Sequence, residues 1–493
     1  MNSGSLLQSS LVSLLPFLIL GLGGVVLLVL DAIWPKSKRF DTTILGIPLV
    51  LLAITALIHQ WRHPIAVTPL KGMYLADTFG AFLGIVICLS LLLTILLSTH
   101  YLKLMGRLRG EYFALLFLSA AGMILLASST ELLTLFLGLE LLSFPVYILT
   151  AFLRKDAKSN EAGMKYFLLG AFSSAIFLYG AAMIYGATGQ TDLMLALSSA
   201  AMPKLLVVGI VLLLSGLLFK VASVPFHMWA PDVYEGAPTA VTAFMATAVK
   251  AAAFGALIRI LIVTFPALAM VPLERIFWWL AVLSMTVGNF AALTQSNIKR
   301  MLAYSSIAHA GYILVGVTAL IASGSSEAVA GILYYLLAYT FMNICAFGVV
   351  IALTEKGRER LEIHELGGVG WRRPGLGLAM IVAMVALSGI PPTAGFFGKY
   401  YIFQSAVKSG LLSLVIIGVL NSALSVYYYF RVLVAFYMKP SEGELLSQRN
   451  AGVGLALAFS VIAILWLAVG PDGVIPGAPQ LLNWVRDSFV ALP

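Results

Sequence analysis

The sequence predicts an all-α polytopic membrane protein. Of its 493 residues, 61% are hydrophobic and only 10% are charged, whereas soluble domains carry about 25% charged residues. A soluble fold could not hide this much apolar side chain, because its surface has to be polar. Composition therefore excludes a soluble enzyme, a nucleic-acid-binding domain and a disordered regulator. Helices are expected because a chain in lipid must satisfy its backbone polar groups within each segment.

Fourteen apolar runs are long enough to be membrane-spanning helices. A span needs about 20 mostly apolar residues to cross roughly 30 Å of hydrocarbon. The runs are bounded by charges, proline, glycine or polar clusters, and they cover residues 11–31, 43–61, 76–101, 111–128, 130–153, 162–188, 204–229, 237–263, 276–297, 300–322, 327–354, 375–408, 411–437 and 452–470. The less apolar tail 478–493 predicts an interfacial helix.

The basic residues between the runs predict the orientation. With the N-terminus outside, 18 Lys and Arg residues fall in cytoplasmic loops and 6 on the opposite side. Such an excess in short loops follows the positive-inside rule. We therefore expect a multi-pass protein of a bacterial inner membrane with both termini on the periplasmic side. The first apolar helix is expected to stay, because the first twenty residues lack the features of a cleaved signal peptide.

Six basic residues are left over from the loops and fall inside the predicted spans, and among the acids only Glu140 lies well inside one. Arg259 and Arg431 lie within a few turns of a helix end, so we expect both to reach the interface and act as anchors. Lys165 lies a few residues into its span on the cytoplasmic side. It is either another such anchor or a residue that takes up protons, and the sequence leaves both readings open.

The remaining four charged residues lie deep in the membrane. Glu140 is about ten residues into its span, near 15 Å depth, and Lys220, Lys250 and Lys399 are comparably central. Each such charge costs about 2.5–3.5 kcal/mol on insertion scales. Buried ion pairs alone cannot account for the set, because three lysines face a single carboxylate. Since desolvation favours the neutral form of a buried amine, these residues are candidates for proton translocation.

Proline and glycine interrupt two of these spans. Pro225 follows Lys220 by five residues, and Pro391 and Pro392 precede Lys399. Proline removes a backbone donor and breaks a helix, and unwound backbone at membrane depth is tolerated where it is buried or lines a watery cavity. Interrupted spans in two halves of a chain point to a transport path.

The two halves also align with each other. Three pairs of positions recur at an offset of 167 to 169 residues, namely Glu140 with His309, Gly163 with Gly331, and Pro225 with Pro392. The offset predicts two duplicated five-helix units within a single transmembrane domain of residues 1–493. Three N-terminal helices would occupy 1–110, the repeats 111–263 and 276–437, and the last helix with the interfacial tail 452–493. His309 is either a packing residue or a proton relay.

The motifs resemble those of a known family. The stretches FKVASVPFHMWAPDVYEGAPTAVTAF, QSNIKRMLAYSSIAHAGY and LSGIPPTAGFFGKYYIF are similar to the antiporter-like membrane subunits of proton-pumping NADH:quinone oxidoreductase, respiratory complex I. The similarity covers essentially all fourteen runs. The chain lacks the long lateral helix of the L type and has Lys399 where the M type typically has glutamate, so it looks like the N type.

This resemblance implies that the two five-helix units are inverted repeats with broken helices at spans seven and twelve. It also implies the roles of the central residues and of the partners. Glu140, Lys220 and Lys250 match the family's functional residues of spans five, seven and eight, and Lys399 occupies the span-twelve position. No metal or cofactor is expected in this chain. NADH, FMN, iron–sulfur clusters and quinone are expected in the other membrane-arm and peripheral-arm subunits, whose electron transfer would supply the energy.

The expected mechanism is a chain of protonatable groups along the membrane midplane. Protons would be taken up near Lys165, pass through Lys220 and Lys250, involve His309 in one version, and leave from Lys399. Glu140, expected beside Lys220, would act as the switch. Two alternatives remain open. The chain could belong to a multi-subunit cation/proton antiporter, or it could be a passive scaffold or quinone-binding subunit.

Overall fold

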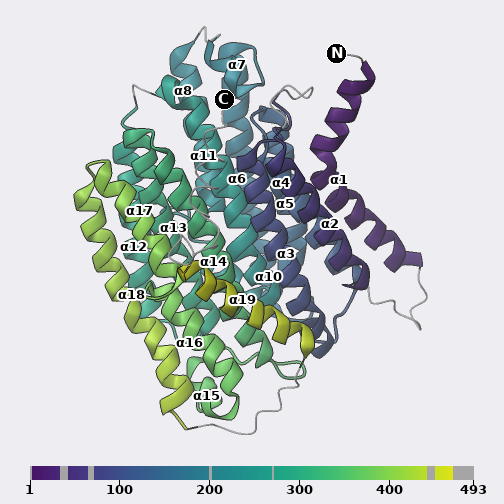
Figure 1. Cartoon of the computed structure of the whole chain (residues 1–493), viewed down its shortest axis with the longest axis vertical. Helices are drawn as coiled ribbons and strands as arrows, with labels where there is room; N and C mark the ends of the chain where they lie inside the picture. The colour runs from purple at the N-terminus through teal and green to yellow at the C-terminus, as the bar shows by residue number, and fades with distance from the viewer. Residues whose placement is uncertain are drawn as a thin grey trace.

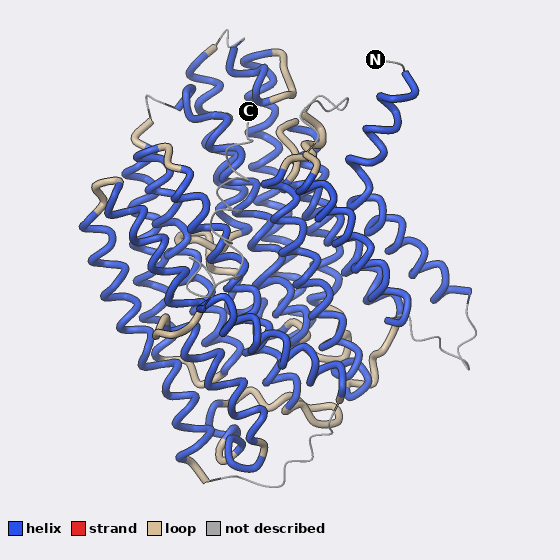
Figure 2. The backbone as a smooth tube through the Cα atoms, in the orientation of Figure 1, coloured by secondary structure: helices blue, strands red, loops and turns tan. Residues whose placement is uncertain are grey.

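The computed structural model of the chain describes residues 3–33, 43–64, 72–198, 202–268, 271–440 and 450–469. These residues form α-helices with short 3-10 and π turns, and no β-strand occurs within those ranges (Figure 2). The predicted all-α class is confirmed. The interfacial helix predicted for 478–493 lies outside the described residues.

Twelve segments make up the first half of the helical framework: α1 (Ser3–Ile33), α2 (Thr43–Arg62), α3 (Thr78–Leu104), α4 (Gly110–Ala127), α5 (Leu132–Thr150), α6 (Ala157–Thr188), α7 (Leu193–Ser198), α8 (Pro203–Lys220), α9 (Ala230–Gly236), α10 (Thr239–Phe244), the π-helical turn η2 (Met245–Val249) and α11 (Lys250–Thr264). The second half comprises α12 (Leu273–Leu293), α13 (Ile298–Ser323), α14 (Ser326–Ala352), α15 (Val369–Arg372), α16 (Pro374–Ser388), α17 (Ala394–Lys408), α18 (Leu412–Met438) and α19 (Ala451–Val469).

Thirteen helices among the described residues are long and apolar enough to span a membrane. One of them runs through α10, η2 and α11. The run predicted at 375–408 instead forms α16 and α17, each 15 residues long, with residues 389–393 non-helical between them. The expected interruption is present there, whereas the count of fourteen spans stays a prediction.

Burial divides the bundle into a centre and a periphery. The most apolar window of α14 is completely buried and that of α13 is 94% buried, against 33% for α1 and 28% for α2. Figure 1 shows α14 in the middle of the bundle, with α1 and α2 at one edge and α12 and α18 at the opposite edge. The helices that are buried all round are therefore those that carry or face His309, Lys250 and Lys399.

The helix ends follow from local sequence. Asp77, Asp156, Asn297 and Ser325 precede α3, α6, α13 and α14, and each side chain accepts a hydrogen bond from a backbone N–H of the first turn. Such caps satisfy donors that have no partner within the helix. Gly324 ends α13 with φ +64°, a left-handed conformation that glycine adopts without steric cost.

The two intramembrane arginines bind protein groups. Arg259 is 1% exposed and forms two hydrogen bonds to the Asp77 carboxylate, of 2.6 and 2.9 Å, and one to the carbonyl of Ala127. These partners place the guanidinium at the start of α3 and the end of α4, where the partly buried Asp77 neutralises it, so the expected anchoring role of Arg259 stays a prediction. Arg431 donates to the carbonyls of Leu293 and Gln295 at the end of α12, so it ties α18 to α12.

Candidate functional site

Three lysines lie inside the helix bundle without a carboxylate partner. Lys220 and Lys250 are 2% exposed and Lys399 is 4% exposed. Among the residues that the structure describes, no aspartate or glutamate oxygen lies within 4.0 Å of these three amines. Buried lysine is ordinarily paired, so the arrangement is costly for a purely structural element.

Lys220 is the last residue of α8 and faces an aromatic cage. Its Nζ donates to the Tyr147 hydroxyl at 3.0 Å and lies 5.1 and 5.6 Å from the ring centroids of Tyr147 and Tyr166. Ring faces attract a cation electrostatically. The cage therefore surrounds the amine with aromatic faces and one hydroxyl, without an ion pair.

Helix α8 ends at Lys220, and residues 221–229 are non-helical up to the start of α9. Pro225 lies in this break, after a cis peptide bond with Val224. Two side chains bind backbone groups at this break. The indole of Trp229 donates to the carbonyl of Phe219 at 3.1 Å, and the N–H of Val224 donates to Ser284 at 2.9 Å. The backbone polar groups thus have partners at membrane depth, as lipid requires.

Lys250 begins α11 directly after the π-helical turn Met245–Val249. Its Nζ donates to both the carbonyl and the hydroxyl of Ser306 on α13, each at 2.6 Å. Ser306 also lies 3.4 Å from the Tyr234 hydroxyl of α9. A π-helical turn is rare and often occurs at a functional position. Here it sets the direction in which Lys250 leaves its helix.

His309 is hydrogen-bonded at both ring nitrogens. Nδ1 pairs with the Tyr335 hydroxyl of α14, and Nε2 lies 2.9 Å from the Tyr429 hydroxyl of α18. Tyr429 in turn lies 2.5 Å from the hydroxyl of Ser305, the residue next to the Lys250 partner. A hydrogen-bonded row Tyr335–His309–Tyr429–Ser305 therefore runs up to the surroundings of Lys250.

Lys399 lies on α17, beyond the second interruption. Its Nζ donates to the carbonyls of Leu387 and Ser388, at 3.3 and 3.0 Å, and to the hydroxyl of Ser422, at 2.9 Å. Leu387 and Ser388 are the last residues of α16, where a cation is favoured by the helix dipole. The Tyr312 ring centroid lies 4.6 Å from the amine.

Glu140 and Lys220 do not form an ion pair in this structure, and the switch expected of them, which closes and opens, stays a prediction. Glu140 lies on α5 two turns before Tyr147, is partly exposed, and its Oε1 is buried with no hydrogen-bond partner among the described residues. Its neighbours along this face, Leu137 and Phe144, are exposed. Glu140 precedes Tyr147 by seven residues on α5, so both lie on the same side of the helix, and the carboxylate is separated from Tyr147 by about two turns along the helix axis.

Lys165 belongs to an ion-pair cluster at the other end of the first interruption. Its Nζ lies 2.8 Å from Asp232 of α9 and 2.6 Å from Glu161, one turn earlier on α6. Arg300 of α13 pairs with the same Asp232, at 2.7 Å, and with Glu235, at 3.0 Å. The cluster holds the short helix α9 between α6 and α13.

The two carboxyls of α9 have altered acidity. Burial alone would raise the pKa of Asp232, but hydrogen bonds from Lys165 and Arg300 outweigh it and hold the pKa below the usual 3.8. Burial likewise opposes ionisation of Glu235, while Lys158 and Arg300 bring its pKa below the usual 4.5. Both groups therefore stay ionised at neutral pH and keep the cluster charged.

Direct hydrogen bonds connect the lysines only in part. Lys220 donates to Tyr147, and Lys250 donates to Ser306, which lies next to Tyr234. Between these two groups, Tyr166 and Trp229 stack on each other through their rings, without a hydrogen bond between them. Bridging water or a change of rotamer would be needed to pass a proton between Lys220 and Lys250.

Sequence reasoning did not identify the hydroxyl partners of the amines: Tyr147, Tyr335, Tyr429, Ser305, Ser306 and Ser422. One signal for them was present, since Ser305 and Ser306 precede His309 by four and three residues, which places them on one face of a helix. The tyrosines gave no signal, because buried aromatic residues in a helix have the same spacing whether or not their hydroxyls are used.

Comparison with known proteins connects this geometry to a family. The family model described as "NADH:quinone oxidoreductase/Mrp antiporter, TM" matches residues 129–425, which contain all the lysines above. The NADH-quinone oxidoreductase subunit N of Trichlorobacter lovleyi is 45% identical over 478 residues, covering 96% of this chain and 97% of the relative.

Solved structures agree on the fold. A chain in the structure "Respiratory complex I from Thermus thermophilus with bound Aureothin" is 36% identical, with a TM-score of 0.79, and the alignment covers 94% of this chain and 98% of that one. A chain of the Mrp complex from Dietzia sp. DQ12-45-1b is 21% identical, with a TM-score of 0.80 over 97% of both chains. The second likeness shows a shared fold alone.

Proposed function

Since the chain belongs to the NADH-quinone oxidoreductase subunit N family, we propose that it translocates protons as an antiporter-like membrane-arm subunit of respiratory complex I. The work needed is about 2.3 kcal/mol for each charge moved against 100 mV. We found no nucleotide, flavin or metal motif in the sequence. The energy is therefore assigned to electron transfer in partner subunits, which would also hold NADH, FMN, the iron–sulfur clusters and quinone.

The observation that carries this proposal is the row of buried amines without carboxylates. A lysine held by hydroxyl and carbonyl oxygens can give up its proton without leaving an unpaired carboxylate behind. Desolvation already disfavours its charged form, so a small change in the surroundings alters its protonation. In the proposed route, protons are taken up beside the Lys165 cluster, pass Lys220 and Lys250, cross the His309 row and leave from Lys399.

Glu140 has a modified role in this proposal. Because it lies about two turns from Tyr147 along α5 and does not contact Lys220, it cannot switch that lysine in the arrangement described above. We assign it to a second arrangement in which α5 shifts or a hydrated group bridges the two residues. Its partly buried carboxylate with an unbonded oxygen is consistent with such a change of partner, since buried carboxylates are costly unless bonded.

The finer architecture belongs to the proposal as well. Fourteen spans require α16 and α17 to count together as one interrupted span. The two inverted repeats would be residues 111–263 and 276–437, with one interruption in each, inside a single domain of 1–493. Both termini would lie on the periplasmic side of the bacterial inner membrane, as the distribution of basic residues predicts.

The alternative assignment is a subunit of a multi-subunit cation/proton antiporter. It shares the fold, but the likeness is at 21% identity, whereas the relatives at 40–45% over most of the chain carry the subunit N name. Co-purification distinguishes the two: NADH-dehydrogenase subunits are expected with this chain, and small antiporter subunits are not.

Replacement of Lys250 by methionine tests the route at its centre. Lys250→Met keeps the length of the side chain and removes the charge, so NADH-driven proton pumping in inverted membrane vesicles should be abolished. Because the change also removes an uncompensated buried charge, the complex should assemble and its melting temperature should not fall. Lys204→Met, at the exposed start of α8, is the matched control and should pump normally. Normal pumping by Lys250→Met would refute the route.

A further inference from the structure

A buried asparagine on α12 joins three helices in the second half of the bundle. Asn289 is 0% exposed, and its Nδ2 lies 3.1 Å from the side-chain oxygen of Asn421 on α18 and 3.2 Å from the carbonyl of the same residue. This nitrogen also lies 3.3 Å from the Tyr312 hydroxyl on α13, and Oδ1 accepts a hydrogen bond of 2.9 Å from Tyr428. Both ends of the amide are therefore hydrogen-bonded inside the bundle.

The partners define the orientation of this amide. A backbone carbonyl can only accept a hydrogen bond, so the atom of Asn289 that faces the Asn421 carbonyl is the nitrogen. The orientation of Asn421 follows in the same way, because its own Nδ2 donates to the carbonyl of Ile417 at 3.0 Å. The Tyr312 hydroxyl must then accept from Asn289, and the Tyr428 hydroxyl must donate to it. Asn289 thus fixes the direction in which two hydroxyl groups point.

Two of these contacts lie next to groups that surround the Lys399 amine. The Tyr312 ring centroid lies 4.6 Å from Lys399 Nζ and 5.7 Å from the ring centroid of His309. Ser422, which follows Asn421, accepts a hydrogen bond from the amine at 2.9 Å. The amide therefore binds one residue that faces Lys399 and the immediate chain neighbour of another.

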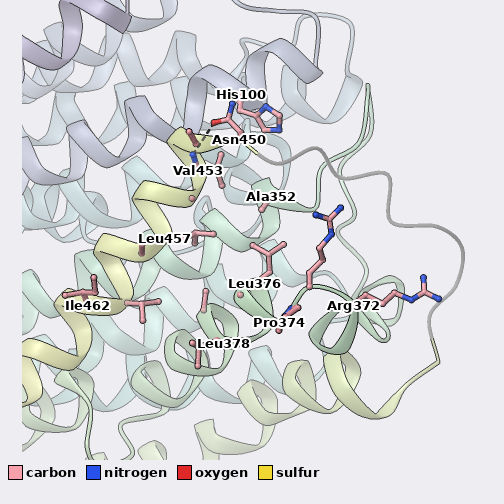
Figure 3. A pocket seen from close by; sticks show the side chains of 17 residues that line it. His100, Ala352, Arg372, Pro374, Leu376, Leu378, Asn450, Val453, Leu457 and Ile462 are labelled. Atoms are coloured by element: carbon pink, nitrogen blue, oxygen red, sulfur yellow. Dashed lines mark hydrogen bonds between the residues drawn. The ribbon is translucent and has the colours of Figure 1, made fainter.

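The cavity between α16 and α19 lies apart from this amine. It measures about 760 Å³, and on α16 it is lined by residues between Pro374 and Ala379 (Figure 3). The carbonyls that bind Lys399 belong to Leu387 and Ser388, about 12 Å further along the helix at 1.5 Å per residue. No residue of α13, α17 or α18 is among the described residues that line the cavity. The α13 and α18 sides of the amine are thus formed by protein groups, and the asparagine amide holds them.

Helix packing alone does not explain Asn289. Arg431 already ties α18 to α12 through the carbonyls of Leu293 and Gln295, and Leu293 lies one turn after the asparagine. A residue that only joined these two helices would make no use of Tyr312 on α13. A buried amide is costly unless it is bonded, but it does not titrate, so it keeps the same hydrogen bonds whether or not the nearby amine carries a proton.

We propose that Asn289 is a positioning residue for proton release from Lys399. In this role it holds the Tyr312 ring against the amine and keeps Ser422 in place to accept a hydrogen bond from it. The amide itself exchanges no proton. The inference rests on the proposed function, in which Lys399 is the last residue of the route.

Asn289→Leu tests this role in the assembled complex. Leucine has a shape close to that of asparagine but no amide, so the helices can still pack while the groups around Lys399 lose their anchor. NADH-driven proton pumping in inverted vesicles should fall about tenfold, as expected when one buried hydrogen bond that orients a reacting group is lost. The pH dependence of pumping should shift by about half a unit or more, which is roughly a threefold change in a protonation equilibrium.

Two control variants separate positioning from packing. Arg431→Met removes the other link between α18 and α12, and Thr318→Val removes a buried side-chain hydrogen bond within α13. Both should pump at the wild-type rate and with the wild-type pH dependence. If Arg431→Met lowers pumping and shifts its pH dependence as much as Asn289→Leu does, the asparagine only holds helices together and the proposal is refuted.

Tyr312→Phe keeps the test open if Asn289→Leu fails to assemble. This variant retains the ring and removes the hydroxyl that the amide binds, so pumping should fall and its pH dependence should shift. Wild-type pumping with wild-type pH dependence in either variant would overturn the proposal. Lys399→Met identifies the level of a failure. If it stops pumping while the Asn289 and Tyr312 variants pump normally, only the positioning role is refuted, whereas normal pumping by Lys399→Met refutes the route and the positioning role together.

Discussion

The interruption between α8 and α9 and that between α16 and α17 each place a buried lysine beside non-helical backbone. At the first, the indole of Trp229 binds the freed carbonyl of Phe219, and Lys220 bonds to the Tyr147 hydroxyl. At the second, Lys399 itself binds the carbonyls that end α16. The first lysine is thus separate from the backbone of its break, whereas the second is part of the backbone cap.

The two buried lysines therefore have different roles at similar helix breaks. Lys220 can lose its proton or its partner without exposing a carbonyl, so its charge is free to change during transport. Deprotonated Lys399 keeps two N–H groups and can still donate to the carbonyls at the end of α16. Replacing the lysine removes these donors from the carbonyls. The comparison makes stability and transport separable at the first break and linked at the second.

The largest expected effect is the loss of transport in Lys220→Met. NADH-driven proton pumping in vesicles should be abolished, because Lys220 is the amine at Tyr147 among the described residues, while the assembled complex should melt at the wild-type temperature or above. A fall in melting temperature comparable to that of the Lys399 variant would erase the distinction between the two breaks.

Lys399→Met should combine the two losses. Pumping should stop, and stability should fall by about 1–3 kcal/mol because carbonyls at the end of α16 lose their donor. The measurement is the thermal unfolding of the purified complex beside its pumping rate. Lys408→Met, nine residues further along α17 and exposed, provides the control, and the loss of its ion pair with Glu327 should cost little.

Trp229→Phe addresses the cap at the first break alone. Phenylalanine keeps an aromatic ring next to Tyr166 but loses the N–H donor, so stability should fall by about 1 kcal/mol and pumping should persist. Trp371→Phe is the counterpart, since its indole also donates to a carbonyl, that of Tyr437, but at an exposed position where water can replace it. If the two variants lose equal stability, the Trp229 hydrogen bond does not owe its importance to the burial of the break.

The smallest effect concerns α9 and acid. The pKa values of Asp232 and Glu235 are lowered on folding, so their stabilising contribution is present above their usual values of 3.8 and 4.5 and is lost as the pH falls below them. Wild type should lose stability on acidification through this range. Asp232→Asn should show a shallower pH dependence, measured by thermal unfolding at several pH values. An identical profile would show that the cluster does not hold α9.

Much of the framework could be predicted from sequence because its causes are local. Apolar runs of membrane length give the helices, and Pro225 and Pro391 with Pro392 mark both breaks. The partners of the amines could not be predicted, because they depend on which face each helix turns inward. Lys220 shows this most clearly: its depth in α8 follows from counting residues, but its hydroxyl partner Tyr147 on α5 does not.

The partner of Arg259 could not be predicted for the same reason. The position of this arginine near a helix end predicted an anchor, and its partner Asp77 is 182 residues away in the sequence. The π-helical turn before Lys250 was equally invisible, since Met245–Val249 has the composition of an ordinary helix. Long-range packing decides such features, and it leaves no periodic trace in one chain.

Because of the π-helical turn, the direction of the Lys250 side chain depends on the number of residues between Pro238 and Lys250. An ordinary helix advances by about 100° per residue, so losing one residue from Met245–Val249 would swing the Lys250 amine roughly a quarter circle from Ser306 at nearly the same depth. We therefore expect the position of Lys250 to tolerate changes of side chain in Met245–Val249 better than the loss of a residue.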